Sequence, residues 1–498
     1  MLPLQLILNY VNHKAIQALN QGLSPGFAIG IVTKNNILFT NGYGLADIEK
    51  NIPYTPDTVN LLASVSKPIS GTMLCLLQKE RTMVATETTR TITIARPDMP
   101  DESILDAKTN IKMSIDYVTK EMLVQDALCH HTGAPTQYGT YLEAIDYSHN
   151  EIICRLPYVI NTDFRNAYRY NNHMFYAGVQ VGVATAGISL EDGYEQLFNL
   201  IGMRNTTLDY YPDKYVGYLK APDNCVNKWI RSGKYNVDQQ LSAGGIYSTV
   251  NDLKKFIQFH LVQQSLPDAD KLISPRFYNG IYTIDTNADT NSQYGLGILV
   301  SYTKYNNQLY KVFDHSGLEE NVHTAIAWAP QLDIGIVILT NSAPSGFPEA
   351  LTSALFSLMA GSTIKQADTL YNEALAAITG ILAADICSFK TCCNVSNNYI
   401  CNKDSAKCRY GRVYNNNENG QVVISDDGYI KIGYLEFVPL IETDDGYTFV
   451  LKNKFELAYP GTVKIIDDTH ISIDYFCVTG IYYAGDIQPL CCGKYVSN

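Results

Sequence analysis

The sequence predicts a mixed α/β fold in which an antiparallel sheet is flanked by helices and interrupted by an inserted helical region, with a small all-β, cysteine-rich domain behind it. Three observations lead to this prediction. Segments with strand character lie at residues 26–45 and again beyond residue 290, while helical patterns dominate residues 120–265. Short β-rich segments between turn residues follow residue 363. Eight of the 12 cysteines fall in the last quarter of the chain.

The first 80 residues are expected to supply a helix, a hairpin and a second helix. The segments GFAIGIV (26–32) and ILFTNGYGL (37–45) flank the turn TKNN and predict a β-hairpin. SVSKPISGTMLCLLQKE (64–80) predicts a helix, whereas residues 81–118 show no helical period and are expected to be a long loop or insertion. The opening segment predicts a helix with one apolar face, formed by Leu4, Ile7, Leu8, Val11, Ile16 and Leu19.

The sheet is expected to be completed far along the chain. TVNDLKKFIQFHLVQQ (249–264) predicts a helix with a threonine cap. Strands return in the segments YGLGILVSY, LYKVFDH, HTAIAWA and IGIVILTN, and a helix follows at residues 348–361. This order assigns residues 1–362 to one domain and predicts a cleft where the inserted helices meet the sheet. Residues 363–498 are assigned to a second domain, in which a connecting helix leads to a small barrel or sandwich.

The composition is that of a soluble globular protein. Of the 498 residues, 46% are apolar and 17% are charged, and the formal net charge is −12. A chain with net negative charge is unsuited to a phosphate backbone, so nucleic acid is not an expected partner. No apolar run reaches the roughly 18 residues that span a bilayer, and the opening segment lacks the basic region and cleavage site of a signal peptide.

The C-terminal cysteines predict a module held by disulfides and made in a secreted or otherwise oxidising setting. Zinc is the alternative, but no C-x-x-C pair occurs and the spacings are irregular. The missing signal peptide conflicts with an oxidising compartment, so the sequence leaves the compartment open. The eight C-terminal cysteines are Cys387, Cys392, Cys393, Cys401, Cys408, Cys477, Cys491 and Cys492. Four scattered cysteines are expected to be small buried hydrophobic residues: Cys75, Cys129, Cys154 and Cys225.

The stretch LLASVSKPISG (61–71) contains a candidate nucleophile. Ser64 lies three residues before Lys67, so both share one helix face, and a nearby base is what a serine hydroxyl needs to become nucleophilic. At a helix N-terminus, Ser64 would also have free backbone N–H groups to stabilise an oxyanion. Pro68 fits the first helical turn. A second S-x-x-K, SYTK (301–304), stands at the end of a predicted strand and is not expected to act.

The flanking sequence resembles the class C β-lactamases and their relatives, a family that also includes penicillin-binding proteins, D-amino-acid peptidases and esterases. Five stretches match its motifs in order over about two-thirds of the chain: ASVSKPISG, ALCHHTGAP, YRYNNHMFYAG, LSAGGIYSTVNDLKKF and FDHSG. The resemblance implies a serine β-lactamase or DD-peptidase-like fold that needs no cofactor and no metal. It also implies a small molecule or short peptide as substrate.

The resemblance assigns roles to four residues around the nucleophile. Ser64 would be acylated, and Lys67 would be its hydrogen-bonded partner. Tyr170 would complete the proton network as general base, with its pKa lowered by Lys67, and would then protonate the leaving group. Asn172 would hold Lys67 and bind the substrate carbonyl.

The third motif departs from the K-T-G that β-lactamases usually carry. His315, Ser316 and Gly317 stand at its positions, so a fixed cation is replaced by a group that is mostly neutral at pH 7. Gly317 would let a substrate backbone pair with the strand edge, Ser316 would offer a hydroxyl, and the N–H of Leu318 would be the second oxyanion donor beside that of Ser64. Peptidase-like and esterase-like relatives share the H-x-G form.

These residues predict a serine hydrolase that works through a Ser64 acyl-enzyme on a β-lactam amide or on a related D-amino-acid peptide or ester bond. The alternative is a catalytically silent binding or scaffold protein that keeps the fold. A metal-dependent β-lactamase is not expected, because the nine histidines form no H-x-H-x-D-H or H-E-x-x-H arrangement. The C-terminal domain loosely resembles the lipocalin-like domain of some peptidase relatives. The oligomeric state is not predicted.

Overall fold

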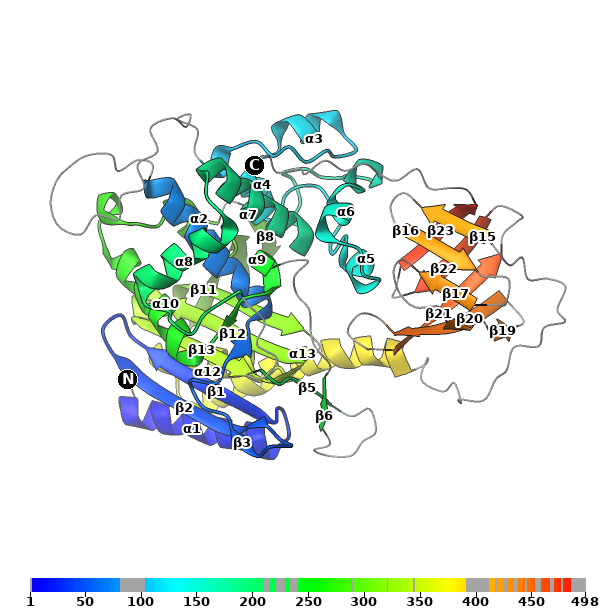
Figure 1. Cartoon of the computed structure of the whole chain (residues 1–498). Coiled ribbons are helices and arrows are strands. Elements are labelled where there is room, and N and C mark those ends of the chain that lie inside the picture. The colour runs from blue at the N-terminus through cyan, green and yellow to red at the C-terminus, as the bar shows by residue number, and fades with distance from the viewer. Residues whose placement is uncertain are drawn as a thin grey trace.

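The computed structural model shows helices packed on both faces of a large antiparallel sheet, with a second set of strands at the C-terminal end of the chain (Figure 1). The described residues are 2–80, 104–208, 215–220, 229–232, 241–280, 282–287, 290–319, 321–343, 345–390 and strand segments between 412 and 484. The large sheet has the order β3-β2-β1-β13-β12-β11-β10-β9-β8. Its strands are β1 (Gly26–Val32), β2 (Ile37–Asp47), β3 (Ile52–Pro53), β8 (Tyr282–Asn287), β9 (Thr290–Tyr294), β10 (Leu299–Tyr305), β11 (Gln308–Glu319), β12 (Val322–Ala329) and β13 (Ile334–Thr340).

The predicted split sheet is confirmed by the pairing of its first strand with its last. β1 and β2 form the expected hairpin, and β1 also pairs antiparallel with β13 from Phe27↔Thr340 to Val32↔Gly335. Every residue of β1 and β13 is buried, which agrees with their continuous apolar sequences. β1 and β13, which lie about 300 residues apart in the sequence, are therefore neighbours in the sheet.

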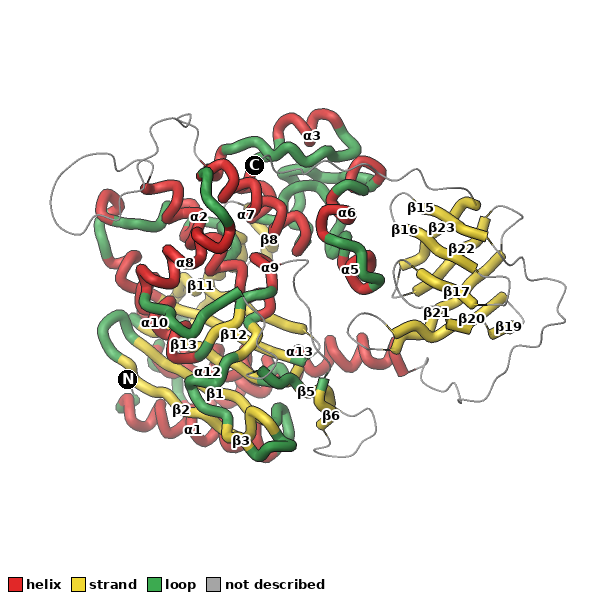
Figure 2. Tube along the Cα trace, in the orientation of Figure 1, coloured by secondary structure: helices red, strands yellow, loops and turns green. Residues whose placement is uncertain are grey.

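Side chains on the sheet alternate between two apolar cores. Ala28, Ile326 and Val337 point to one core, which lies against α2 (Ser66–Glu80), α7 (Asn172–Ala186) and α10 (Val250–Ser265). Phe27 and Ile336 point to the other core, which lies against α1 (Leu4–Asn20) and α12 (Phe347–Met359). Figure 2 shows the sheet between these helices. The helix is confirmed, but its buried face is only partly the predicted one: Ile7 and Val11 are buried and Leu8 and Leu19 are partly buried, whereas Leu4 and Ile16 are exposed.

The inserted region is helical, as predicted, and Thr249 caps α10 by accepting a hydrogen bond from the backbone N–H of Asp252. Of the predicted loop 81–118, residues 81–103 lie outside the described part, and the remainder contains a 3-10 turn and the start of a helix, which the sequence did not predict.

The shorter helices are α3 (Asp116–Glu121), α4 (Val124–Leu128), α5 (Thr140–Ala144), α6 (His149–Ile153), α8 (Leu190–Ile201), α9 (Leu241–Gly244) and α11 (Pro275–Tyr278). The 3-10 turns are η1 (Ala63–Val65), η2 (Ile104–Asp106), η3 (Leu156–Tyr158), η5 (Asp268–Asp270) and η6 (Pro330–Leu332). Short strands are β4 (Asn60–Leu61), β5 (Tyr218–Lys220), β6 (Trp229–Arg231), β7 (Tyr247–Ser248) and β14 (Ser342–Ala343).

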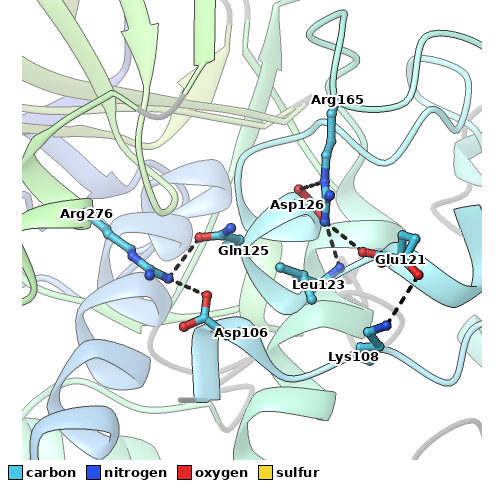
Figure 3. A network of polar contacts seen from close by, with 8 residues as sticks. All are labelled: Asp106, Lys108, Glu121, Leu123, Gln125, Asp126, Arg165 and Arg276. Atoms are coloured by element: carbon cyan, nitrogen blue, oxygen red, sulfur yellow. Dashed lines mark hydrogen bonds and ion pairs between the residues drawn. The ribbon is translucent and has the colours of Figure 1, made fainter. Parts of the chain in front are cut away.

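A polar network holds α4 in place (Figure 3). The Arg165 guanidinium donates to both carboxylate oxygens of Asp126, at 2.8–3.1 Å, and to the backbone oxygen of Glu121 at 2.7 Å. Asp126 is fully buried and also accepts from the backbone N–H of Leu123 at 2.8 Å. Helix α4 and the end of α3 are thereby tied to the loop that leads into Tyr170.

The C-terminal region begins with the long helix α13 (Ile364–Lys390). Its first turns contact the first helix, because Asp368 pairs with Lys14 at 2.8 Å and accepts from the Tyr10 hydroxyl at 3.0 Å. An antiparallel sheet of order β18-β17-β16-β15-β23-β22-β21-β20-β19 follows. Its strands are β15 (Arg412–Asn416), β16 (Gly420–Ile424), β17 (Tyr429–Ile432), β18 (Val438–Pro439), β19 (Ile441–Thr443), β20 (Gly446–Lys452), β21 (Ala458–Ile465), β22 (His470–Tyr475) and β23 (Val478–Ala484). The 362/363 domain boundary and the lipocalin likeness stay predictions.

Two of the four scattered cysteines behave as predicted. Cys75 and Cys129 are free and buried. Cys154 is instead disulfide-bonded and only partly buried, so its assignment as a small buried hydrophobic residue was wrong. Cys225 and the side chains of the eight C-terminal cysteines lie outside the described residues, so the predicted disulfide module stays a prediction. Within the described part of the chain, no helix has the length and apolar run that crossing a bilayer requires.

Candidate active site

Ser64 lies on a short turn at the junction of the sheet and the inserted helices. The sequence predicted Ser64 at the start of a helix, but the structure places it in the 3-10 turn η1, two residues before α2 begins. Ala63 has a positive φ of 47°, which costs energy for a residue with a Cβ and turns the chain sharply before Ser64. Thr324 on β12 donates to the Leu62 carbonyl at 2.7 Å and fixes this turn to the sheet. The Ser64 side chain stays partly accessible.

Lys67 is fully buried and its amine has three oxygen neighbours. Nζ lies 3.0 Å from Ser64 Oγ, 2.6 Å from Asn172 Oδ1 and 2.8 Å from the carbonyl oxygen of Ala243. Burial lowers the pKa of Lys67 well below its ordinary value, and the charge of Glu319 offsets part of that effect. A neutral amine in this position has two N–H groups for Asn172 and Ala243 and one lone pair directed at Ser64.

Tyr170 is the third member of this network. Its phenol donates a hydrogen bond to Ser64 Oγ at 2.7 Å. The sequence predicted that Lys67 lowers the pKa of this phenol, and that prediction was wrong. Burial raises the Tyr170 pKa, the hydrogen bond with Ser64 opposes the shift, and Glu319 adds to it. Lys67 Nζ lies 4.7 Å from the centre of the Tyr170 ring, but burial disfavours the charged form of this amine as well.

The loop between Tyr170 and α7 is anchored by Asn171, the middle residue of the Y-x-N motif. The Asn171 side chain caps α7 by accepting from the Met174 N–H at 2.9 Å and donates to the carbonyls of Pro135 and Tyr138, each at 3.0 Å. Its backbone N–H donates to Nδ1 of His130 at 3.1 Å. The imidazole of His130 also packs on the Tyr170 ring at 4.3 Å between centroids. The ALCHHTGAP segment thus positions Tyr170 and Asn172.

The third motif lies on a part of β11 with one open edge. The pairing of β10 with β11 ends at Leu299↔Asp314, whereas β12 stays paired through Glu319↔Val322. Within the described residues, positions 315–319 therefore have a strand partner on one side only. A Cβ added to Gly317 would lie 2.2 Å from the Leu62 oxygen and 3.1 Å from the Ser64 nitrogen, so only glycine allows this approach. Ser316 and Leu318 are exposed and alternate to the opposite face from His315.

His315 is neutral in this structure, as the sequence led us to expect. Its Nδ1 lies 2.6 Å from the Ser316 carbonyl oxygen and its Nε2 lies 2.8 Å from the Tyr294 hydroxyl. The first contact requires a proton on Nδ1, so Nε2 accepts from the tyrosine. Burial lowers the His315 pKa to about 3, with a further contribution from Lys67.

Sequence reasoning missed four contributors to this site. Ala243 acts through its carbonyl, which no side-chain motif reveals, although its LSAGG segment was among the matched stretches. Tyr294 was recognisable only as the first residue of YGLG, and His130 only as one histidine of a pair. Glu319 was not singled out, although the period-two alternation of β11 places it on the face of His315 and Gly317. The second S-x-x-K lies within β10, where residues three apart point to opposite faces.

The described residues contain no cluster of three or more histidine, cysteine, aspartate or glutamate side chains that could hold a metal ion. The family model of the Beta-lactamase family matches residues 12–357, well over half of the chain. The chain belongs to the β-lactamase family. The matched segment runs from the first helix to α12 and so includes all three parts of the site described above.

This β-lactamase-family protein is similar to the following proteins at low sequence identity. Protein flp of Staphylococcus aureus (strain MW2) is 22% identical over 333 residues, which are 65% of this chain and 61% of flp. The octameric penicillin-binding protein homologue from Pyrococcus abyssi covers 95% of this chain and 99% of its own, with TM-score 0.57 and 16% identity. The class C β-lactamase from Rhodobacter sphaeroides covers 75% of this chain and 99% of its own, with TM-score 0.51 and 18% identity. At identities this low, the structural likeness establishes the shared fold alone.

Proposed function

We propose that this protein is a serine hydrolase that forms an acyl-enzyme on Ser64 and hydrolyses a β-lactam amide or a related D-amino-acid peptide or ester bond. The observation that carries the proposal is the position of Ser64 Oγ between two proton-transfer groups, 3.0 Å from Lys67 Nζ and 2.7 Å from the Tyr170 hydroxyl. A base on one side of the serine hydroxyl can remove its proton. An acid on the other side can then protonate the leaving group, and neither side chain has to move.

In the first step Lys67 is the base. Its pKa is lowered, so the neutral amine takes the Ser64 proton while Oγ bonds to the carbonyl carbon of the substrate. Asn172 and the Ala243 carbonyl accept hydrogen bonds from the amine and hold it in line, both before and after it becomes an ammonium. The oxyanion that forms is assigned to the backbone N–H groups of Ser64 and Leu318, because β11 passes directly beside the Ser64 nitrogen at Gly317.

In the second step Tyr170 is the acid. Its raised pKa keeps the phenol protonated, so it can deliver its proton to the departing nitrogen or oxygen when the tetrahedral intermediate collapses. The Lys67 ammonium then returns a proton to the phenolate, and both groups recover their starting states. Water attacks the Ser64 ester by the same route in reverse, which releases the acid product and regenerates the hydroxyl.

Hydrolysis of three substrates tests the proposal: nitrocefin, a p-nitrophenyl ester and a D-alanyl dipeptide. We expect Ser64→Ala to lose the activity on whichever of them is turned over. Ser301→Ala, which removes the serine of the second S-x-x-K, should keep that activity. Turnover that persists in Ser64→Ala would disprove the acyl-enzyme, and no Ser64-dependent turnover of any substrate would favour a binding or scaffold protein.

A further inference from the structure

A polar pocket lies between the β10–β11 hairpin and the turn that joins α12 to α13, on the opposite side of the large sheet from α2. Its volume is about 290 Å³. The hairpin contributes Lys304 and Asn306, and the helices and their turn contribute Ser357 and Ser362. Lys304 is the lysine of SYTK, the second S-x-x-K. The residues that line this pocket are all different from those that surround Ser64.

The hairpin turn holds an amide at this pocket. Tyr305 and Gln308 are the last pair of β10 and β11, so Asn306 and Asn307 form a two-residue turn. Both asparagines have positive φ, 46° and 63°, which the twist of such a hairpin requires and asparagine tolerates. A Cβ added to Gly361 would lie 3.6 Å from Asn306 Nδ2, so this amide is close to the α12–α13 turn. The hairpin therefore adds an amide donor beside the lysine ammonium.

The hydroxyl of Ser357 in α12 indicates that the pocket receives a ligand. Ser357 is 1% exposed, and its Oγ has no hydrogen-bond partner among the described residues. Thr352 in the same helix shows the usual arrangement, because its hydroxyl donates to the Pro348 carbonyl four residues earlier at 2.8 Å. A buried hydroxyl without a partner is unfavourable, and a polar group bound in the pocket would supply the partner.

The charges around the pocket favour an anion. Among the described residues, the lining includes the Lys304 ammonium and no carboxylate. The Asp368 carboxylate, in the first turns of α13, is paired with Lys14 at 2.8 Å. The N-terminus of α13, a helix of 27 residues, adjoins the pocket through Ser362 and Gln366. The N–H groups and the dipole at a helix N-terminus attract negative charge.

The other lining groups suit a ligand that also carries hydroxyls. The pocket presents the hydroxyls of Ser357, Ser362 and Thr369 and the side-chain amides of Asn306 and Gln366. These groups can bond to ligand hydroxyls as well as to the oxygens of an anion. The volume is close to the lower end of the range for small-molecule sites, which is about 300 to 1,000 Å³. The ligand is therefore small.

We propose that this pocket binds a small hydroxylated organic anion, a carboxylate or a phosphate monoester of a few carbon atoms. Lys304 and the N-terminus of α13 hold its charge, and one of its oxygens bonds to the Ser357 hydroxyl. This site goes beyond the proposed hydrolase function and does not depend on it, because the two sites share no residue. A bound anion also joins the β10–β11 hairpin to the α12–α13 turn, so binding should raise the melting temperature.

Isothermal titration calorimetry with glycerol 3-phosphate, glycerate and glycerol tests the proposal in a buffer without phosphate or carboxylate. The three probes share a three-carbon hydroxylated body and differ in their anionic group. We expect the wild-type protein to bind at least one of the two anions at millimolar concentration with one-to-one stoichiometry. Glycerol should bind at least about tenfold more weakly, because it lacks the charge that meets Lys304. The anion that binds more tightly shows whether the site takes a phosphate or a carboxylate.

Variants of the lining connect the binding to this pocket. Lys304→Met should weaken binding of the preferred anion about tenfold or more, and Ser357→Ala about threefold or more. Ser357→Ala should not lower the melting temperature of the protein without ligand, because it removes a hydroxyl that has no partner in the described structure. Lys34→Met is the matched control, since Lys34 is exposed on the β1–β2 hairpin turn, and should leave the Kd unchanged. Ser64→Ala should also leave it unchanged.

Three results would overturn the anion site. The first is no binding of either anion to the wild-type protein, or binding of glycerol with equal affinity. The second is a Kd that stays the same in Lys304→Met and Ser357→Ala. The third is a loss of binding in Ser64→Ala, which would place the anion at the catalytic serine. Turnover that survives in Ser64→Ala would overturn the proposed hydrolase mechanism and leave the anion site in place.

Discussion

At the scale of single residues, the site depends on the protonation states of Lys67 and Tyr170. Burial lowers the pKa of the amine and raises the pKa of the phenol, so burial favours the neutral form of both groups. A neutral amine accepts the Ser64 proton and a neutral phenol donates one, which divides the base and acid roles between two side chains on the same oxygen. The sequence-based assignment gave both roles to Tyr170, and it could not include burial.

The pH dependence of acylation tests this division. Glu319 raises the Lys67 pKa, so Glu319→Gln should lower that pKa further and let the neutral amine persist to lower pH. The acid limb of kcat/KM against pH, measured on an uncharged p-nitrophenyl ester, should therefore move to lower pH in the variant. A limb that stays in place or moves to higher pH would show that Lys67 is not the base.

At the scale of secondary-structure elements, the site is assembled from segments that lie far apart in the sequence. The nucleophile turn is fastened to β12 through Thr324, the Y-x-N loop is fastened to the 130–138 segment through Asn171, and α4 is fastened to the following loop through Arg165. Each link uses a polar side chain that satisfies backbone groups which would otherwise be buried without partners.

The Arg165–Asp126 link should contribute strongly to stability. Arg165→Met removes the guanidinium and leaves the buried Asp126 carboxylate without its ion pair, which should lower the free energy of unfolding by about 3 kcal/mol. Lys108→Met is the matched control in the same network (Figure 3), because the Lys108–Glu121 pair is exposed and should contribute less than about 1 kcal/mol. Urea denaturation of both variants measures the difference, and equal losses would contradict the role of burial.

At the scale of the whole molecule, six of the nine strands of the large sheet were predicted, whereas β3, β8 and β9 and the details of the open edge were not. Alternating and continuous apolar segments identified every strand from β10 to β13, and the Thr249 cap marked the start of α10. The split order of strands predicted that the early and late strands share one sheet, but not that β1 pairs with β13. The positive φ at Ala63, the Ala243 carbonyl and the partner of His315 depend on contacts between remote segments, which local sequence patterns do not contain.

The folding stability of the whole molecule should depend on pH through Asp314, the residue before His315 in β11. Burial raises the pKa of Asp314 to about 7. Repulsion from Glu349 adds to this shift, and a hydrogen bond with Ser301 opposes it. The folded state thus holds a proton that the unfolded chain has already lost above pH of about 4, so folding stability from this group falls as pH rises from about 4 to about 7.

Asp314→Asn should remove this loss. The drop in melting temperature between pH 5 and pH 8 should be smaller in the variant than in the wild-type protein, as followed by differential scanning calorimetry. Asp268→Asn, at an exposed site, should leave the drop unchanged. A variant that loses as much stability over this range as the wild-type protein would show that Asp314 is ionised in the folded state throughout.

The claim that Ser64 is the acylated nucleophile is tested most directly by covalent labelling. A fluorophosphonate probe bonds to an activated serine with loss of fluoride, and intact-mass and peptide mass spectrometry then locate the adduct. The account predicts a single adduct on Ser64, strongly slowed in Lys67→Met, absent in Ser64→Ala and retained in Ser301→Ala. An adduct that forms equally in Ser64→Ala, or that maps to a different residue in the wild-type protein, would contradict it.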